Sequence, residues 1–275
     1  MISLYQFGNS VCCQKVRIVL AEKELSWAAT EVDLFRNEQF DPEYLRLNPA
    51  GTVPTLVHDG AVVTESTLIC EYLDASFPNP SLMPATPLGQ AQARVWAKLV
   101  DEGLHEGVGA ISFSAMFRER MQAMTPAERQ IRYDNIGDLK RGDLFRQTFE
   151  HGAKAKQVTF AVSAYERIFR RLETALTVGG PWIMGDAVTL ADIALMPYVA
   201  RLSYLGLLDL WIAERPAAQS WWTQVQAWPS FRAGITLPMI PREAEEMALH
   251  GPKIRTELAE TLAETLAEIN LGYPV

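Results

Sequence analysis

The sequence predicts an α/β domain at the N-terminus followed by an all-α region. Residues 2–7 alternate in the manner of a strand, residues 11–23 show helical periodicity, and residues 27–34 are again strand-like. A β-α-β unit of this kind implies a parallel pair of strands. From about residue 90 onwards the apolar residues recur almost throughout at helical spacing. The chain therefore combines a small sheet with a larger helical part.

The first helix is expected to bury one side against the sheet. Val16, Val19 and Leu20 recur at helical spacing and should face the core. The charged residues of the same helix are expected on the solvent side: Lys15, Arg17, Glu22 and Lys23.

A hairpin and a further helix complete the first domain. The apolar segment 55–57 is followed by the turn Asp59-Gly60 and the return segment 61–63, which predicts two antiparallel strands. Pro54 cannot donate to a central ladder, so it should lie where the first of these strands begins. A helix should start at Glu65-Ser66 and end before the proline-rich run that begins at Phe77-Pro78.

This proline-rich run, which extends to Pro87, is the predicted domain boundary. We expect domains at residues 1–80 and 88–275. Helical periodicity predicts helices over residues 90–121, 159–177, 190–205 and 217–228, and leucines about four apart predict one more near the C-terminus. Residues 124–156 are rich in charge and form either a long surface excursion or an irregular helical extension. The sequence Thr189-Leu190-Ala191-Asp192 fits a capping box, a structural device that starts a helix.

Composition excludes several classes of function. The net charge of -8 arises from acidic and basic residues mixed along the chain, so we expect no nucleic-acid partner and no anionic membrane partner. The first residues lack a secretion signal, and no apolar run is long enough to cross a bilayer. The three cysteines, an odd number that includes an adjacent pair, are not a secreted disulfide framework. These features predict a cytoplasmic protein, and we expect no metal site.

Ser10 lies after a strand and directly before a helix. The unsatisfied N–H groups and the positive end of the helix dipole make this position favourable for an anion. A serine here is equally suited to an ordinary N-cap role. The residues alone leave both interpretations open.

The adjacent thiols offer a different chemistry. Ser10-Val11-Cys12-Cys13 is similar to a C-x-x-C redox site whose first cysteine has become serine. Cys12 or Cys13 on the first helical turn could have a lowered pKa and form mixed disulfides, or both could pack as small apolar residues. Cys70, on the apolar face of a later helix, is expected in the core.

Four segments, in this order along the chain, resemble the glutathione transferase family, in particular its serine-type, theta-like and zeta-like members. They are Phe7-Gly8-Asn9-Ser10-Val11-Cys12-Cys13-Gln14-Lys15-Val16-Arg17-Ile18, then Asn48-Pro49 with Val53-Pro54-Thr55-Leu56, then Glu65-Ser66 with Glu71-Tyr72-Leu73, and finally Gly185-Asp186 with Thr189-Leu190-Ala191-Asp192-Ile193. The resemblance implies a thioredoxin-like domain that binds glutathione, an all-helical domain that binds the second substrate, and a homodimer.

The resemblance also assigns roles to individual residues. Ser10 would donate its hydroxyl to the sulfur of glutathione, so that the thiolate of glutathione is the nucleophile. Val53 would pair with the cysteinyl backbone beside a cis Pro54, and Glu65 and Ser66 would bind the γ-glutamyl end. Gln39 would bind the glycyl end. Thr52 replaces the Lys or Gln common in the family, and it completes the expected glutathione-binding set.

The second substrate is expected to be a small hydrophobic electrophile. After the boundary, residues 96–117 mix small, aromatic and sulfur-containing side chains, which suits a flat apolar ligand but equally suits packing between helices. The expected pocket residues are Ser112, Phe113, Met116 and Phe117. Residues 62–73, with Lys98 and Val100-Asp101-Glu102, also resemble the bacterial β-aryl-etherases, which cleave lignin-derived aryl ethers with glutathione.

These observations lead to one principal hypothesis and two alternatives. The principal hypothesis is a glutathione transferase that acts on an aromatic electrophile, including by cleavage of a β-aryl ether. The first alternative is a glutathione-dependent thiol oxidoreductase that uses Cys13. The second is a non-catalytic protein of the same fold that binds ligands or partners.

Overall fold

The computed structural model describes residues 1–134 and 139–270, and its chain forms two compact units. The first unit contains Met1–Ala97, Gly179–Pro197 and Ser220–Pro241. The second contains Lys98–Val178, Tyr198–Gln219 and the chain from Arg242 onwards. Each unit is therefore built from three separate stretches of sequence.

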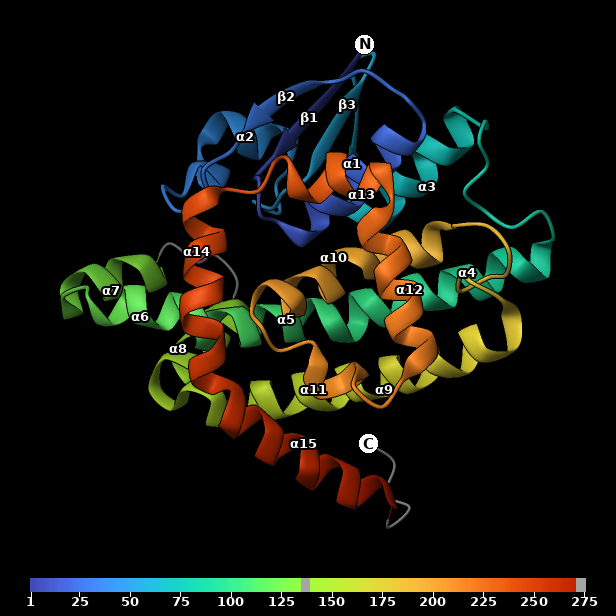
Figure 1. The fold of residues 1–275 in the computed structure, drawn as a ribbon. Helices are drawn as coiled ribbons and strands as arrows, with labels where there is room; N and C mark the ends of the chain where they lie inside the picture. The colour runs from blue at the N-terminus through green and yellow to red at the C-terminus, as the bar shows by residue number, and fades with distance from the viewer. Residues whose placement is uncertain (135–138, 271–275) are drawn as a thin grey trace. The chain divides into compact units, whose positions relative to one another are not determined.

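The sheet of the first unit has four strands in the order β2-β1-β3-β4 (Figure 1). Its strands are β1 (Ile2–Gln6), β2 (Ala28–Glu31), β3 (Thr55–His58) and β4 (Ala61–Thr64). β1 pairs with β2 in parallel and with β3 antiparallel, and β3 and β4 form an antiparallel hairpin. The predicted β-α-β unit and hairpin are both confirmed, and so is the fold class.

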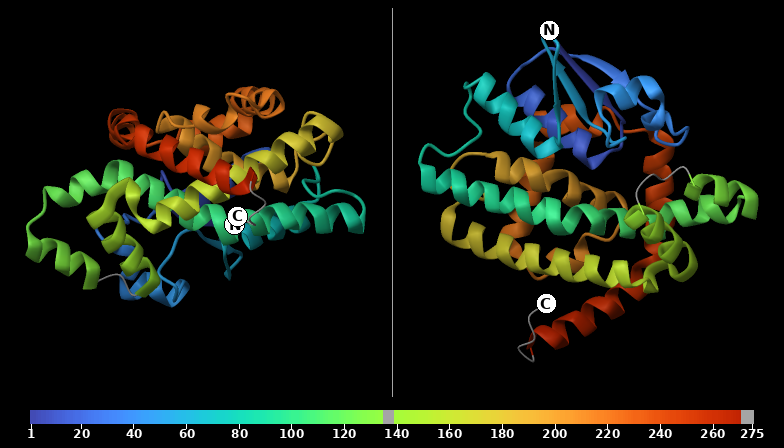
Figure 2. Two further views of the ribbon diagram at one scale, coloured as in Figure 1. Left: turned by 90° about the horizontal axis from the view of Figure 1, so that it is seen from below. Right: turned by 180° about the vertical axis from the view of Figure 1, so that it is seen from behind.

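Helices lie on both faces of this sheet (Figure 2). Successive side chains of a strand point to opposite faces. Gln6 contacts Arg17 of α1 (Val11–Glu22), whereas Tyr5 packs on Tyr44 of α2 (Pro42–Leu47). α3 (Ser66–Ser76) packs on α1, so α1 and α3 cover the face opposite to α2. The short helix α2 had not been predicted.

The expectation that the charged face of α1 lies in solvent is wrong. Lys15 and Arg17 are each 1% exposed and Lys23 is 6% exposed. α1 packs on α3 on one side and on residues 229–236 on another, so its polar side is covered as well. Glu22 is half-buried and accepts hydrogen bonds from this distant segment. The first-helix pattern predicted the helix but not what would pack against it.

The described residues that follow the hairpin are mainly helical, which confirms the predicted all-α region. The remaining α-helices are α4 (Pro87–Leu99), α5 (His105–Ser112), α6 (Arg118–Gln122), α7 (Pro126–Asp134), α8 (Leu139–His151), α9 (Lys156–Gly179), α10 (Leu190–Tyr204), α11 (Asp209–Ile212), α12 (Pro216–Ala227), α13 (Pro229–Phe231), α14 (Pro241–His250) and α15 (Arg255–Asn270). For residues 124–156 the sequence left two interpretations, and the presence of α7 and α8 favours the helical extension. Residues 135–138 of this segment lie outside the described part.

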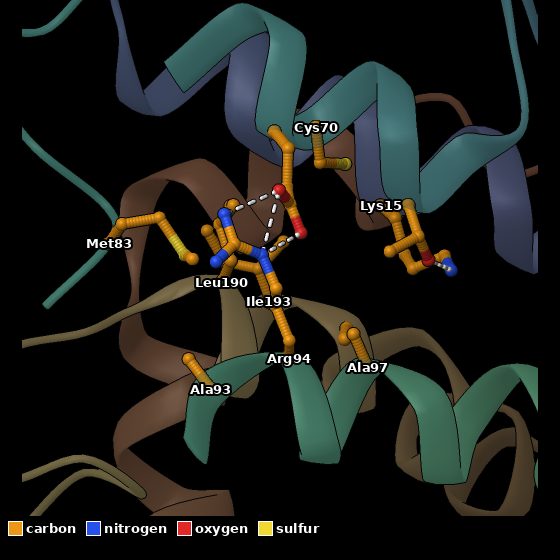
Figure 3. A pocket seen from close by; sticks show the side chains of 11 residues that line it. Lys15, Cys70, Met83, Ala93, Arg94, Ala97, Leu190 and Ile193 are labelled. Carbon is orange, nitrogen blue, oxygen red and sulfur yellow. Dashed lines mark hydrogen bonds and ion pairs between the residues drawn. The ribbon is translucent and has the colours of Figure 1, made fainter. Parts of the chain in front are cut away.

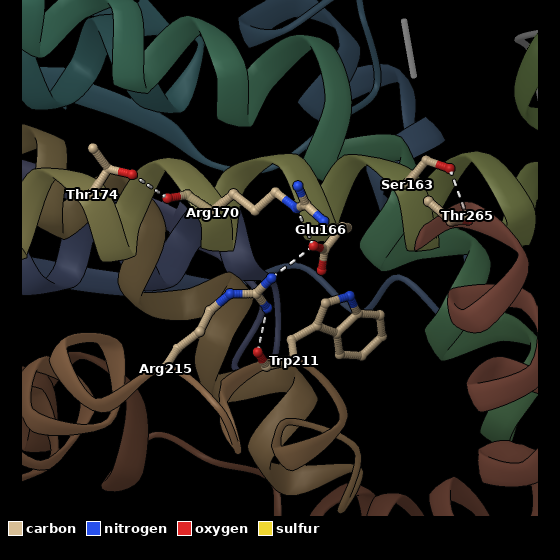
Figure 4. A network of polar contacts seen from close by, with 7 residues as sticks. All are labelled: Ser163, Glu166, Arg170, Thr174, Trp211, Arg215 and Thr265. Atoms are coloured by element: carbon tan, nitrogen blue, oxygen red, sulfur yellow. Dashed lines mark hydrogen bonds and ion pairs between the residues drawn. The ribbon is translucent and has the colours of Figure 1, made fainter. Parts of the chain in front are cut away.

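A buried carboxylate links α9 to the segment around α11 in the second unit (Figure 4). Glu166 of α9 accepts hydrogen bonds from Arg170 Nε at 2.5 Å and from Arg215 Nη2 at 2.7 Å. Arg215 also donates to the carbonyl of Trp211 in α11. A buried charge is tolerated when it is paired in this way.

The predicted capping box at the start of α10 is confirmed. Asp192 Oδ2 accepts hydrogen bonds from the backbone N–H of Thr189 at 3.0 Å and from its hydroxyl at 3.1 Å. The other oxygen, Oδ1, accepts from Ile183 N at 2.9 Å and from Trp221 Nε1 at 3.0 Å. Burial raises the pKa of the Asp192 carboxyl, and the four donors act in the opposite direction. This carboxylate links three segments of the first unit: the one at Ile183, the start of α10 and α12.

Candidate functional site

The register of the sheet brings the ends of several strands to one edge. Tyr5 of β1 lies opposite Thr55 of β3, and Thr55 lies opposite Thr64 of β4. The chain that leaves β1 towards Ser10, the chain that enters β3 at Pro54 and the chain that leaves β4 towards Ser66 therefore meet at the same end of the sheet. The parallel strand β2 ends there too, because Gln6 lies opposite Glu31. Candidate residues far apart in sequence are thus neighbours in the first unit.

Ser10 occupies the N-cap position of α1. Its backbone is extended (φ -68, ψ 120), and its Oγ accepts a long hydrogen bond from Cys13 N at 3.4 Å. Ser10 N donates to Phe7 O at 3.1 Å and closes a turn directly after β1. An N-cap bond uses a lone pair of the hydroxyl and not its proton, and the same hydroxyl also forms a hydrogen bond with the Cys13 thiol that acts to lower the pKa of that thiol. The two interpretations of Ser10 left open by the sequence are therefore compatible.

The two adjacent cysteines have different surroundings. Cys13 is 0% exposed, and burial raises the pKa of its thiol to about 11, despite the nearby charge of Arg17. Cys12 is half-buried. Since the reactive form is the thiolate, Cys13 is poorly suited to redox chemistry near neutral pH. The buried position of Cys70 confirms its expected place in the core.

The loop that enters β3 is held by side chains of α2 and its C-terminal end. Tyr44 Oη donates to the carbonyl of Thr52 at 2.5 Å, and Asn48 Nδ2 donates to the same carbonyl at 2.8 Å. The Val53–Pro54 peptide bond is cis, and Pro54 is buried while Thr52 is exposed. Tyr44 and Asn48 were missing from the predicted site. The only signal for them in the sequence was the turn pair Asn48-Pro49.

The start of α3 has an unusual backbone. Glu65 is exposed and adopts φ 67, ψ 110, a conformation that is costly for a residue other than glycine. It makes no side-chain cap bond, and Ser66 begins the helix as a buried residue. The first N–H groups of α3 and its positive dipole end can therefore bind a carboxylate.

Gln39 lies in a short 3-10 helix, Glu38–Phe40, that follows β2. Its side chain is buried, and Oε1 has no hydrogen-bond partner among the residues that the structure describes. An unsatisfied buried carbonyl is expensive unless a ligand or water completes it. Gln39 therefore has the property of a ligand-binding residue.

The four residues predicted for the second substrate lie in the second unit, near a π-helical turn at Phe113–Phe117. Ser112 is buried and receives a hydrogen bond from Arg201 Nη1 at 3.0 Å. Phe113 is stacked on Phe145 of α8 with centroids 4.8 Å apart, and Met116 is also buried. Phe117 is half-buried, with the Arg120 guanidinium over its ring.

A small pocket in the first unit lies between α3, α4 and α10 (Figure 3). Its lining includes Cys70, Met83, Ala97 and Ile193. The carboxylate of Glu71 is held at its edge by Arg94 at 3.0–3.1 Å. The pocket is largely apolar and its charged groups are paired, so no catalytic role follows from it.

In residues 1–134 and 139–270, no group of three or more His, Cys, Asp or Glu side chains is arranged to hold a metal ion. Within the same residues, no helix is both long enough and apolar enough to span a bilayer.

Two family models match the chain. The model described as glutathione S-transferase, N-terminal domain, matches residues 9–76, and the corresponding C-terminal domain model matches residues 126–222. Among curated proteins, protein LigF of Sphingobium sp. (strain NBRC 103272 / SYK-6) is 41% identical over 129 residues, which are 46% of this chain and 50% of LigF. This sequence match therefore spans half of that relative.

Longer matches come from a plant protein and from a solved structure. Glutathione S-transferase 1 of Dianthus caryophyllus is 45% identical over 208 residues, 75% of this chain and 80% of the plant protein. The crystal structure of the beta-etherase LigF from Sphingobium sp. strain SYK-6 superposes with a TM-score of 0.75 at 29% identity and covers 85% of this chain and 98% of that one.

Proposed function

Since the chain belongs to the glutathione S-transferase family, we propose that it activates the thiol of glutathione for attack on a hydrophobic, aromatic electrophile. The observation that carries this proposal is the position of Ser10. Its hydroxyl caps α1 through a lone pair, a bond that does not use the hydroxyl proton, and it lies at the sheet edge where α3 also begins. Two helix N-termini at one edge favour a ligand with more than one negative group.

Glutathione matches the other groups at this edge. We assign its γ-glutamyl carboxylate to Ser66 and the first N–H groups of α3, and its ammonium to the carboxylate of the exposed Glu65. The backbone of Val53, with Thr52 before it and the cis Pro54 after it, would pair with the cysteinyl part of the peptide. The unsatisfied Oε1 of Gln39 would accept a hydrogen bond from the glycyl part.

In the reaction, Ser10 donates a hydrogen bond to the glutathione sulfur and does not itself become covalently bound. The thiol loses its proton to solvent, because a donor hydroxyl and the amide end of α1 both favour negative sulfur. The thiolate then attacks an electrophilic carbon: a carbon–sulfur bond forms, and the bond from that carbon to the leaving group breaks with both electrons departing on the leaving group.

For the acceptor we propose an aryl ether, with a phenolate as the leaving group. Support comes from the resemblance to LigF, whose structure is described as that of a beta-etherase. On the protein side we assign the acceptor pocket to Ser112, Phe113, Met116 and Phe117. Phe117 is the side chain of this set with open surface, so we expect it to contact the aryl ring directly.

The thiol oxidoreductase alternative has weaker support. It requires a reactive thiolate at Cys13, and the burial of that thiol with a pKa of about 11 works against it. The non-catalytic alternative is separated from ours by assay, since it allows glutathione binding without turnover.

We also propose a homodimer in the cytoplasm. Leu68 of α3 and Leu88 of α4 are 58% and 70% exposed, and Val62 and Val95 of the same unit are exposed as well. These side chains belong to β4, α3 and α4, and exposed apolar surface is usual at interfaces between copies. The cytoplasm supplies the reduced glutathione that the reaction needs. Light scattering after size exclusion, with Leu68→Glu as the disrupting variant, tests the dimer.

The decisive experiment compares wild type with Ser10→Ala. The thiol pKa of bound glutathione is measured from thiolate absorbance against pH, and turnover is measured on a panel of aryl ethers, halogenated aromatics and epoxides. We expect Ser10→Ala to raise the thiol pKa and to lower turnover by about 100-fold, as for loss of one key donor, while glutathione affinity changes little. Ser81→Ala is the matched control on an exposed loop. An unchanged thiol pKa in Ser10→Ala would reject the proposal.

A further inference from the structure

A segment near the end of the first unit runs against the loop that carries Ser10. This segment, residues 232–241, is here called the strap; it contains a π-helical turn at Arg232–Thr236 and ends where α14 begins (Figure 1). Both family models end before it, at residues 76 and 222. The strap and the loop nevertheless belong to the same compact unit.

Arg17 joins the strap to the loop. Its guanidinium donates from Nη2 to Gly8 O at 2.6 Å and from Nε to Gly234 O at 2.8 Å, and Nη1 lies 3.5 Å from Phe7 O. Phe7 O is also the acceptor for Ser10 N. Three acceptors of this buried cation are therefore backbone carbonyls, one in the strap and two in the turn that positions Ser10. The fourth is the side-chain Oε1 of Gln6 at 3.3 Å.

Two glycines and one asparagine show that the strap packs closely on α1 and on the loop before it. A Cβ on Gly234 would lie 2.6 Å from Ile18 Cγ1, and a Cβ on Gly8 would lie 2.8 Å from Pro238 O. Asn9 Oδ1 accepts a hydrogen bond from Ile240 N at 3.0 Å. The residue directly before Ser10 is thus attached to the strap as well.

We propose that Arg17 is a positioning residue: it fastens the Ser10 loop to the strap and so holds the Ser10 hydroxyl where the glutathione thiol is activated. The inference rests on the function proposed above for Ser10. It adds that the geometry of the thiol site depends on a segment more than two hundred residues away in sequence, which neither family model covers. Arg17 touches no reacting atom, and its effect passes through the carbonyls of Phe7 and Gly8.

A second buried cation on the same helix supplies a matched control. Lys23, at the C-terminal end of α1, donates to Asp74 Oδ1 and to the carbonyls of Phe77 and Pro80. Removal of either charge should destabilise the first unit, because each leaves buried acceptors without a donor. Only the removal of Arg17 should disturb the Ser10 loop.

The test compares Arg17→Met, Arg17→Lys and Lys23→Met with wild type by two measurements. Hydrogen exchange of residues 6–13 reports the order of the loop without any reference to activity. The thiol pKa of bound glutathione reports the placement of Ser10. For Arg17→Met we expect faster exchange of the loop and a thiol pKa higher by about one unit, equivalent to about tenfold less thiolate near neutral pH. Lys23→Met should change neither the exchange of the loop nor the thiol pKa. Arg17→Lys should give values between those of wild type and Arg17→Met, because it keeps the positive charge but loses the forked hydrogen bonds of the guanidinium.

If the hydrogen-exchange rates of the loop in Arg17→Met equal those of wild type, the positioning role of Arg17 is refuted, whatever the activity of the variant. Equal changes of loop exchange and thiol pKa in Lys23→Met would also refute this role, since general destabilisation of the first unit would then explain the effect of Arg17→Met. If Arg17→Met does not fold, Arg17→Lys takes its place, because it keeps the charge but removes the forked hydrogen bonds to the loop and the strap. Unchanged exchange of the loop in Arg17→Lys then refutes the positioning role of Arg17. Failure of the proposed function gives a different result: the thiol pKa is insensitive to Ser10→Ala while the loop still loosens in Arg17→Met.

Discussion

The starts of α3 and α10 each carry a carboxylate and a hydroxyl side chain. At α10 these groups bind the protein itself, whereas at α3 the carboxylate is exposed. At α10, the Asp192 carboxylate is fully buried and accepts four hydrogen bonds from the protein itself. At α3, Glu65 is exposed in a positive-φ conformation, makes no cap bond, and leaves the first N–H groups of the helix to another partner. A helix start satisfied by its own chain contributes stability, whereas one left open at the cost of backbone strain is suited to a ligand.

The largest expected effect is a loss of stability when Asp192 at the start of α10 is removed. Asp192→Ala leaves four donors, namely Ile183 N, Thr189 N, Thr189 Oγ1 and Trp221 Nε1, without their acceptor. It should lower the free energy of unfolding by about 3–5 kcal/mol. Urea denaturation measures this loss, and the exposed Asp186→Ala is its control. Glutathione affinity of the folded fraction should stay within about twofold of wild type. Loss of binding in fully folded Asp192→Ala would contradict the separation of the two helix starts.

Cys13 belongs with the structural groups, although it lies near Ser10. Its thiol has a pKa of about 11 in the folded state against an ordinary value of 9.0. Between these values the unfolded chain loses the proton and the folded chain keeps it. Stability should therefore be intact below pH 9 and fall as pH rises, by about 1.4 kcal/mol per unit and about 3 kcal/mol in total.

This pH dependence is measured as the difference between wild type and Cys13→Ala in urea denaturation from pH 8 to 11. Other groups titrate in both proteins and cancel in the difference. Parallel curves for the two proteins would mean that Cys13 ionises as easily in the folded state as in the unfolded chain, which would restore it as a redox candidate.

Substitution of Ser66 tests directly whether the start of α3 binds glutathione. Ser66→Ala should raise the Kd for glutathione about tenfold, equivalent to about 1.4 kcal/mol, because the γ-glutamyl carboxylate loses one donor. The free energy of unfolding should change by less than about 1 kcal/mol. Calorimetry gives the affinity, and Ser76→Ala at the other end of α3 is the control. A large stability loss with unchanged affinity would make Ser66 a structural cap like Thr189.

The smallest expected effect has an unusual sign. Gln39→Met removes a buried carbonyl that has no partner in the described part of the chain, so the free protein should keep its stability or gain up to about 1 kcal/mol. Its glutathione affinity should fall a few-fold. Gln6→Met is the matched change, since Gln6 donates to Glu31 and accepts from Arg17, and it should destabilise the protein by about 1–2 kcal/mol. Equal stability losses in both would mean that Gln39 is satisfied in the free protein.

Local chemistry in the sequence was sufficient for much of the fold and for part of the site. Period-two and helical patterns predicted the strands and the long helices, because these patterns depend on residues a few positions apart. Ser10, Ser66 and Thr189 could be recognised as helix starts for the same reason. The short helices α2, α13 and α14 had not been predicted, since segments of this length depend on what packs against them.

The amino-acid sequence by itself determined the order of strands and helices, the family resemblance and the candidate donors at each helix start. Only the tertiary structure decided which of those groups are satisfied. Arg17 and Lys23 have the helical spacing of solvent-facing residues, and they are buried because chain from elsewhere in the fold covers them, in the case of Arg17 from 217 residues away. Burial and hydrogen-bond satisfaction depend on contacts between distant segments, which local periodicity does not record.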